Sequence, residues 1–543
     1  MHLKYIRNIL QDRSRSTFFV LVVLAFILRL WALPQAELNP DGMLWTNRGI
    51  NLVRQFSYGS ELGHPGIVPA YLIGLSMMFF GSSIEGSLGI LPTIIAARLP
   101  VVIFGSLTVG IIYLIGQRIS GYYVGLVAGA LLALDPIHIG TSRIIHLDVI
   151  LTFFFTLSIY YILEYEEKSS MRNLVLLSIA TALTVLSKKP GLAVYGITIV
   201  WVGYSKFSKY LMSEEIKSLK LKQSTKHLII YICLSLLIVY IGYPRLWGNP
   251  IETIPGLFIS ASERVISGGG HEVGNYWMGE PTPAPPNSFY IIITLISLTE
   301  ISVVLGLLGL AIVGYKLIHY PLEKRKIYLI PVWILSFLIP MSIAAKKLGA
   351  RYILPLWPAY TLLAAIGFVA IFRILVFDNE ISLNENHKSL LKHLGLVLLC
   401  MSLIFPVVSI TPDYGSYNNE FIGGPSGGEE VWLKGGGYIE SIDYIQDDGG
   451  ENADILVLGN TNIPTYYYNG SFDNNGRVNA GSGYIAFANR DQWERKNQYD
   501  YLIIINSYIQ RNPNHPVVIW GSEQKADHKA KIRGVTKAYV YKI

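Results

Sequence analysis

The sequence is poor in cysteine and in charged residues for its length. Two cysteines occur in 543 residues, and both Cys233 and Cys400 lie inside apolar runs. Neither a disulfide framework nor a Cys-rich metal site is therefore available. Charged residues make up 15% of the chain, whereas hydrophobic residues make up 51%. Such a chain is too apolar for an ordinary soluble multidomain protein, and its long apolar runs indicate several membrane crossings.

Several catalytic motifs are also missing. No Gly-rich phosphate loop follows a strand-like segment, no His-x-x-x-His pair suggests zinc, and no Asp-x-Asp occurs after the first apolar run. These absences count against nucleotide-sugar chemistry and against a metal centre. No cofactor is predicted, and a divalent metal has no support in the sequence.

The net charge of +7 does not predict nucleic-acid binding. Lysine and arginine gather in short segments between apolar runs, notably in 206–227 and 316–326, as the positive-inside rule expects of cytoplasmic loops. The basic N-terminus precedes an apolar run without a small-residue cleavage site, which indicates a retained signal anchor. We therefore predict a multi-pass protein of the cell membrane whose N-terminus and two lysine-rich loops are cytoplasmic.

Eleven apolar segments are long enough, or nearly long enough, to cross a bilayer. A twelfth stretch, 67–80, is ambiguous, and its crossing would place the 206–227 loop outside. We therefore predict that 67–80 is an interfacial or re-entrant helix. The eleven segments cover approximately residues 17–33, 99–116, 122–137, 149–163, 173–187, 190–205, 228–243, 290–318, 328–344, 353–374 and 392–409.

After about residue 411 the apolar runs shorten to strand length between Gly- and Asn-rich turns. We predict an α-helical polytopic membrane domain over 1–410 and a small extracytoplasmic α/β domain over 411–543. The predicted secondary structure of the second domain comprises strands at Ile455–Leu458, Leu502–Ile505, Val517–Trp520 and Ala538–Ile543 and a helix at Tyr438–Gln446.

Asp41 is the leading candidate for chemistry. It follows the first apolar run in Asn39-Pro40-Asp41-Gly42, where the chain is predicted to reach the outer membrane surface. A carboxylate there can act as a general base on an acceptor hydroxyl or amine. The alternative is that Asp41 caps a surface helix, a position that Asp favours.

Charged residues near the predicted outer ends of the spans run against the positive-inside rule. This asymmetry favours an anionic partner such as a phosphate or diphosphate, whose oxygens suit Arg and Lys. A salt bridge between Arg143 and Asp148, with lipid headgroups around it, is the structural alternative. The outer-end residues are Arg98, Arg143, Asp148, Lys188, Lys189, Lys346, Lys347 and Arg351. The loop 244–287 adds aromatic and polar residues that suit a sugar or lipid headgroup, or an interfacial belt of Trp and Tyr.

In their order along the chain, these residues resemble the GT-C membrane glycosyltransferases of the protein O-mannosyltransferase and lipid A aminoarabinose transferase kind. The resemblance rests on Asp41, His64-Pro65-Gly66, Ala97-Arg98-Leu99-Pro100, Ser142-Arg143 through Leu147-Asp148, Ser187-Lys188-Lys189-Pro190-Gly191, Tyr243 to Pro250, His271 through Gly279-Glu280, and Arg351-Tyr352 through Pro355 and Pro358. In the tail it extends to Tyr414 through Tyr417, Gly423-Gly424 and Ile509-Gln510-Arg511.

The resemblance implies transfer of a sugar, hexose or pentose, from a polyprenyl-phosphate carrier to a protein, lipid or glycan acceptor at the outer face, with inversion at the anomeric carbon. It implies that Asp41 deprotonates the acceptor. Two departures leave the acceptor open: mannosyltransferases carry Asp-Glu in place of Asp41-Gly42, and His-Pro-Pro in place of His64-Pro65-Gly66. The implied substrate-binding residues are Arg98, Lys347 and Arg351 for the carrier phosphate, Arg143, Asp148 and Lys189 for the shape of the site, and His64, Arg245, His271, Glu280 and Tyr352 in addition.

Two other functions compete with this one. A transporter or flippase of lipid-linked sugars would also need charges within the membrane, but such proteins usually show internal repeats and broken helices, which are not evident in the sequence. A lipid-binding scaffold without catalysis requires that Asp41 be only a helix cap.

Overall fold

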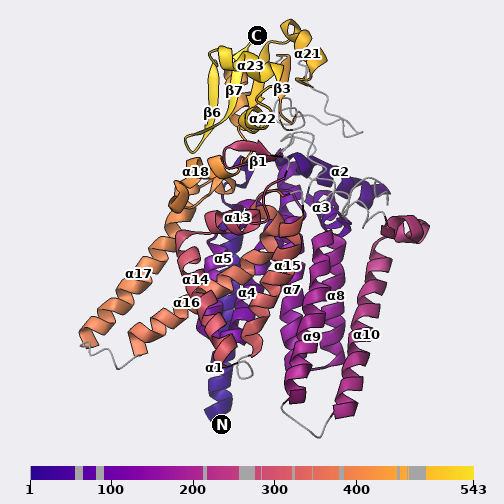
Figure 1. Ribbon diagram of the computed structural model, residues 1–543, viewed down its shortest axis with the longest axis vertical. Coiled ribbons are helices and arrows are strands. Elements are labelled where there is room, and N and C mark those ends of the chain that lie inside the picture. Colours follow the sequence, from indigo (N-terminus) through magenta and orange to yellow (C-terminus); the bar gives the residue numbers. More distant parts are fainter. Residues whose placement is uncertain are drawn as a thin grey trace.

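The computed structural model describes residues 2–55, 65–80, 91–211, 217–255, 275–282, 284–320, 325–344, 347–377, 385–448, 453–460, 463 and 485–543. Long helices form a bundle, and a smaller region containing a β-sheet lies at one end of it (Figure 1). The N-terminus lies at the opposite end of the bundle (Figure 1).

The helices of the bundle coincide with the apolar runs of the sequence. All eleven predicted segments fall largely on helical residues, because a bilayer leaves the backbone no partners outside its own helix. The helices are α1 (His2–Leu30), α2 (Pro40–Gln55), α3 (Ile67–Phe80), α4 (Leu91–Ser120), α5 (Tyr122–Ala133), α6 (Pro136–Thr141), α7 (Asp148–Glu167), α8 (Met171–Ser187), α9 (Ala193–Leu211), α10 (Lys217–Gly242), α11 (Arg245–Gly248), α13 (Phe289–Ser297), α14 (Glu300–His319), α15 (Leu329–Ile343), α16 (Trp357–Phe377) and α17 (Glu385–Ile410). The 3-10 helices between them are η1 (Leu33–Gln35), η2 (Lys189–Leu192), η3 (Arg325–Tyr328) and η4 (Ala350–Leu356).

The chain is a multi-pass membrane protein, although the predicted count of eleven spans is not confirmed. In the described part of the chain, seven helices are long and apolar enough to cross a membrane. They cover Ile94–Ser120, Asp148–Glu167, Thr225–Gly242, Glu300–His319, Lys326–Ile343, Ala350–Ile374 and His393–Ile410.

Helix α3 is shorter than a span. Its 14 residues rise by about 21 Å at 1.5 Å per residue, whereas the hydrocarbon core is about 30 Å thick. It packs against α2 and α4 near the sheet-bearing end of the bundle (Figure 1). Its length agrees with an interfacial or re-entrant helix, and its sidedness stays a prediction.

The prediction of one segment over 290–318 is wrong, because two helices occupy it. Helix α13 ends at Ser297, and the extended residue Thr299 caps α14 by accepting a hydrogen bond from the Ser302 N–H at 3.4 Å. The side-chain amide of Asn419 donates to the carbonyls of Leu295 and Leu298 at the end of α13. Caps of this kind supply partners that helix termini lack, so they stabilise a break inside an apolar run.

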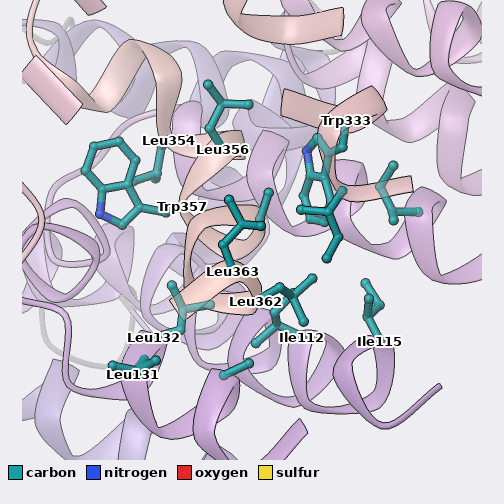
Figure 2. Close-up of a cluster of buried hydrophobic side chains, with 14 of the residues drawn as sticks. Ile112, Ile115, Leu131, Leu132, Trp333, Leu354, Leu356, Trp357, Leu362 and Leu363 are labelled. Atoms are coloured by element: carbon teal, nitrogen blue, oxygen red, sulfur yellow. The ribbon is translucent and has the colours of Figure 1, made fainter. Parts of the chain in front are cut away.

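A buried apolar cluster holds α4, α5, α15 and α16 together (Figure 2). The indole N–H of Trp357 donates to Asp135 at 3.1 Å, so this buried polar atom has a partner. The cluster fixes η4, which leads directly into α16. Its residues in Figure 2 include Ile112, Ile115, Leu131, Leu132, Trp333, Leu354, Leu356, Trp357, Leu362 and Leu363.

The region after α17 contains a five-stranded mixed sheet of order β4-β3-β5-β7-β6. Strand β3 is parallel to β4 and β5, whereas β7 is antiparallel to β5 and β6. Alternate residues of the central strands face two apolar clusters, one beneath α19 and the other beneath α23. The elements are η5 (Tyr414–Ser416), η6 (Glu420–Ile422), α18 (Gly424–Val431), α19 (Tyr438–Asp447), β3 (Ile455–Leu458), β4 (Ile485–Phe487), α21 (Arg490–Glu494), η7 (Lys496–Gln498), β5 (Tyr501–Ile505), α22 (Asn506–Arg511), α23 (Pro516–Glu523), β6 (His528–Ile532) and β7 (Val535–Lys542). A separate hairpin joins β1 (Asn275–Trp277) and β2 (Glu280–Thr282).

The predicted α/β character of the tail is confirmed, with one error. Three predicted strands lie on β3, β5 and β7, and the predicted helix lies on α19. The fourth predicted strand, Val517–Trp520, is part of helix α23. The two residues before Val517 start this helix. The His515 side chain accepts a hydrogen bond from the Val517 N–H at 3.3 Å, and Pro516 occupies the first helical position.

Candidate functional site

Asp41 lies in the first turn of α2, with its carboxylate free for tertiary contacts. Pro40 opens the helix, and Asn39 Oδ1 accepts a hydrogen bond from the Asp41 N–H at 3.1 Å. The Asp41 carboxylate faces away from its own helix, toward the turn before α7 and the 3-10 helix η4. Its Oδ2 lies 3.2 Å from His146 Nε2 and accepts from an Arg351 N–H at 3.1 Å.

A second carboxylate stands behind His146. Asp148 Oδ2 lies 2.6 Å from His146 Nδ1, and Asp148 Oδ1 accepts from Lys188 Nζ at 2.6 Å. Asp148 begins α7, and Lys188 directly follows α8. Three helices, α2, α7 and α8, and the turn before α7 therefore converge on one chain of contacts, Asp41 to His146 to Asp148 to Lys188.

The chain of contacts becomes more exposed toward Asp41. The side chains of Asp148 and Lys188 are 1% and 3% exposed, whereas that of Asp41 is 43% exposed. The Tyr352 ring makes cation–π contacts with Lys188 and Arg351. Lys188 Nζ lies 4.4 Å and the Arg351 guanidinium 5.2 Å from its ring centroid. Asp41 is thus the member of the network that a substrate can reach.

Partial burial alone would raise the pKa of Asp41. The hydrogen bond with His146 and the positive charge of Arg351 outweigh burial, and together they hold the pKa of this carboxyl well below its usual range. Asp41 is consequently ionised at physiological pH and can accept a proton.

The network opens into a cavity of about 750 Å³ between the helical bundle and the sheet-bearing region. Both parts of the chain supply its walls. The bundle side includes Glu37, Asp41, Trp45, Arg143, His146, Lys188, Arg351 and Tyr352, and the other side includes Trp432, Lys434, Tyr438, Asn460, Tyr508 and Arg511. Sites between two structural units with a few converging polar groups commonly bind ligands.

Of the residues predicted from sequence, Asp41, Asp148, Lys188, Arg351 and Tyr352 come together at this network. Arg143 also lines the cavity, but it does not pair with Asp148. Its guanidinium donates to the carbonyls of Pro412, at 2.7 Å, and of Ala32, and it lies 5.0 Å from the Tyr414 ring centroid. Arg143 therefore ties the bundle to the start of the tail.

Two predicted phosphate ligands lie elsewhere. Arg98 donates to the carbonyls of Leu33 and Ala36, each at 2.6 Å, and Lys347 Nζ donates to the carbonyl of Pro285 at 3.0 Å. Burial lowers the pKa of Lys347. Both side chains brace backbone segments, and neither is among the residues that line the cavity.

The remaining predicted residues are also apart from the network. Lys189 lies in η2, while its neighbour Lys188 takes the position against Asp148. Arg245 in α11 and Glu280 in β2 are exposed and do not line the cavity. His64 and His271 lie outside the described residues.

Sequence reasoning missed His146, the central member of the network. The available signal was its position two residues before Asp148, in a turn already singled out for its charges. The wall formed by Trp432, Lys434 and Arg511 carried no local signal that links it to Asp41, because only the tertiary fold joins them.

The described ranges contain no group of three or more His, Cys, Asp or Glu side chains that could hold a metal ion.

Comparison with known proteins identifies the architecture. Residues 21–244 match the family model of dolichyl-phosphate-mannose-protein mannosyltransferases. No curated protein sequence matches the chain significantly. Among solved structures, the chain is similar to ArnT from Cupriavidus metallidurans bound to undecaprenyl phosphate, with 13% identity, a TM-score of 0.53, and coverage of 96% of this chain and 97% of that one.

A second similar structure is the archaeal oligosaccharyltransferase AglB from Archaeoglobus fulgidus, in complex with an inhibitory peptide and a dolichol-phosphate. It shares 12% identity and a TM-score of 0.53, covering 94% of this chain and 72% of that one. The resemblance to the GT-C membrane glycosyltransferases is thereby confirmed, by a family model over residues 21–244 and by a shared fold over nearly the whole chain.

Proposed function

We propose that this protein is an inverting glycosyltransferase that moves a sugar from a polyprenyl-phosphate donor to an acceptor at the outer membrane face, with Asp41 as general base. The observation that carries the proposal is the ionised, accessible Asp41 beside Arg351 and Lys188, in a cavity between the bundle and the tail. A base and cations for a phosphate are the two groups that this reaction requires.

In the proposed reaction, the acceptor hydroxyl or amine attacks the anomeric carbon from the side opposite the phosphate. The acceptor's proton passes to an oxygen of Asp41 as the new bond forms. The bond between the anomeric carbon and the phosphate oxygen breaks, and its electron pair leaves with the polyprenyl phosphate. Attack from the opposite side inverts the configuration at the anomeric carbon.

Arg351 has two roles in this scheme. A guanidinium can bind two phosphate oxygens at once and stabilise the negative charge that develops when the sugar departs. In the free protein Arg351 donates to Asp41, and its charge lowers the pKa of that carboxyl. When Arg351 turns to the donor phosphate, the pKa of Asp41 rises, so that Asp41 becomes a stronger base as the donor binds.

The proposed sidedness follows from charge and from the fold. The basic N-terminus and the sheet-bearing region lie at opposite ends of the bundle (Figure 1). If the N-terminus and the lysine-rich loops are cytoplasmic, the cavity and the region from residue 411 are extracytoplasmic.

The test is the substitution Asp41→Asn. We expect turnover to fall by about 10²–10⁴-fold, because the amide keeps the shape of the side chain but cannot accept the acceptor's proton. The measurement is transfer of labelled sugar from a polyprenyl-phosphate donor in reconstituted vesicles, with donor binding measured in parallel. Asp491→Asn is the matched control, since Asp491 is exposed in α21. Near-normal turnover of Asp41→Asn would refute the base assignment.

A further inference from the structure

The wall of the cavity that faces the network carries its own cations. Arg511 ends α22 and lines the cavity, and its guanidinium lies 5.8 Å from the centroid of the Trp432 ring. Its Nε is buried and has no hydrogen-bond partner among the described residues. Burial lowers the pKa of Arg511. A partly desolvated guanidinium is costly to hold without an anion, so its position calls for an explanation.

The carboxylate whose charge acts on Arg511, that of Glu429, is already bound to other groups. Glu429 forms a buried ion pair with Lys537, and its other oxygen accepts from the Lys434 N–H at 2.9 Å. The Lys434 ammonium also lines the cavity, and it donates to neutral groups, the Tyr417 carbonyl at 2.7 Å and Asn418 Oδ1 at 3.3 Å. In the described structure, neither Arg511 nor the Lys434 ammonium forms a salt bridge with a carboxylate. Burial lowers the pKa of Lys434 to about 7, against the opposing charge of Glu429. The wall therefore offers an anion the Arg511 guanidinium and a lysine that is partly charged at neutral pH.

We propose that Arg511, with its guanidinium over the Trp432 ring and with Lys434 on the same wall, forms a subsite for an oxyanion, a phosphate or carboxylate carried by the acceptor. The N–H groups of a guanidinium can bind two oxygens of such a group at once. The subsite deepens the proposed function, and its assignment to the acceptor rests on that function. In the proposed reaction the donor phosphate binds Arg351 on the bundle wall, so a cationic group on the opposite wall serves a second anionic group.

Phosphate binding tests the subsite without catalysis. Inorganic phosphate is titrated calorimetrically into the detergent-solubilised full chain. We expect two binding events in the wild type, of which Arg511→Gln loses one and Arg351→Gln loses the other. The loss should be tenfold or more in affinity, since a charge-assisted hydrogen bond contributes about 1.5–3 kcal/mol. Arg511→Lys should weaken the same event by less, because it keeps the charge but not the fork.

Arg490→Gln is the matched control, because Arg490 is 86% exposed in the same sheet-bearing region. Circular dichroism and thermal unfolding verify that each variant is folded. A wild-type stoichiometry and affinity in folded Arg511→Gln would overturn the subsite. A folded Arg511→Gln that loses its phosphate event supports it.

A second titration separates the two sources of the anion. Binding of undecaprenyl phosphate should be weakened by Arg351→Gln and unchanged by Arg511→Gln. A comparable weakening by Arg511→Gln would overturn the assignment to the acceptor and give the site to the donor lipid. Failure of the proposed function has a different signature, namely undiminished transfer by Asp41→Asn, which leaves the phosphate titrations untouched.

Discussion

At the scale of single residues, His146 determines how Asp41 behaves. Its ring joins two carboxylates, with Nε2 toward Asp41 and Nδ1 toward Asp148. The pairing of Asp148 with Lys188 fixes the far side of this arrangement. A ring oriented in this way holds the Asp41 carboxylate in place, which is the function of positioning residues around reactive groups.

We predict that His146→Gln lowers turnover about tenfold or more and moves the acid limb of the pH–rate profile to higher pH. The bond from His146 is the largest contribution that lowers the pKa of Asp41, so its loss raises that pKa and protonates the base at a higher pH. Turnover is measured over a pH series, with exposed His319→Gln as control. If activity falls equally at every pH and the acid limb does not shift, His146 does not set the pKa of Asp41 and its role is structural.

Some site residues were predictable and others were not, for reasons visible in the chain. Asp41 and Arg351 could be predicted from the sequence because a charge at the predicted outer end of an apolar run is unusual. The adjacent lysines 188 and 189 look alike in sequence. The backbone separates them, because Lys188 is extended at the end of α8 whereas Lys189 begins η2, so only the first reaches Asp148.

At the scale of elements, glycines let α14 and α16 approach closely. A Cβ on Gly309 would lie 1.9 Å from the Leu363 carbonyl oxygen, and a Cβ on Gly367 would lie 2.2 Å from that of Leu305. The backbones of the two helices therefore touch, as at small-residue crossings in membranes. Because α16 continues directly from η4, this crossing also sets the position of Arg351.

We predict that Gly309→Ala destabilises the protein by about 1–3 kcal/mol, because the added methyl group must push a backbone away rather than a flexible side chain. The measurement is the thermal unfolding midpoint in detergent. Gly314→Ala is the matched control on the same helix, since a Cβ there meets nothing within 4 Å. Equal midpoints for the two variants would contradict the close crossing.

Apolar periodicity predicted the helices better than it predicted their breaks. The break at Thr299 depends on a cap and on Asn419, which is 120 residues further along the chain. The run Val517–Trp520 looks like a strand in isolation, yet His515 and Pro516 start a helix there. Local patterns fix where apolar segments lie, whereas caps and distant partners decide how they are divided.

At the scale of the whole molecule, Glu37 connects the bundle to the sheet-bearing region. Its carboxylate accepts hydrogen bonds from the N–H groups of Gly437, Tyr438 and Ile439, at 3.1, 2.5 and 3.2 Å. These groups open α19, and Gly437 adopts a φ of 89°, which glycine tolerates best. Glu37 thus joins the two parts of the chain at the wall of the cavity, through a contact that sequence could not reveal because 400 residues separate its partners.

Burial raises the pKa of Glu37 to about 7, against the opposing effects of the three N–H groups and of the Lys537 charge. A raised carboxyl pKa means that the folded state holds the proton more tightly than the unfolded state. The contribution of Glu37 to stability is therefore full below the ordinary pKa of the carboxyl and is lost as pH rises through about 7.

We predict that contact between the two parts weakens from pH 5.5 to pH 8, and that Glu37→Gln removes most of this dependence, because the neutral amide keeps an acceptor oxygen without a titrating proton. Hydrogen exchange of the backbone amides at the start of α19, corrected for intrinsic rates, measures the contact directly. Glu494→Gln serves as control, since Glu494 is 68% exposed in α21. If wild type and Glu37→Gln lose protection in parallel as pH rises, another group governs the contact, and the pH dependence assigned to Glu37 is wrong.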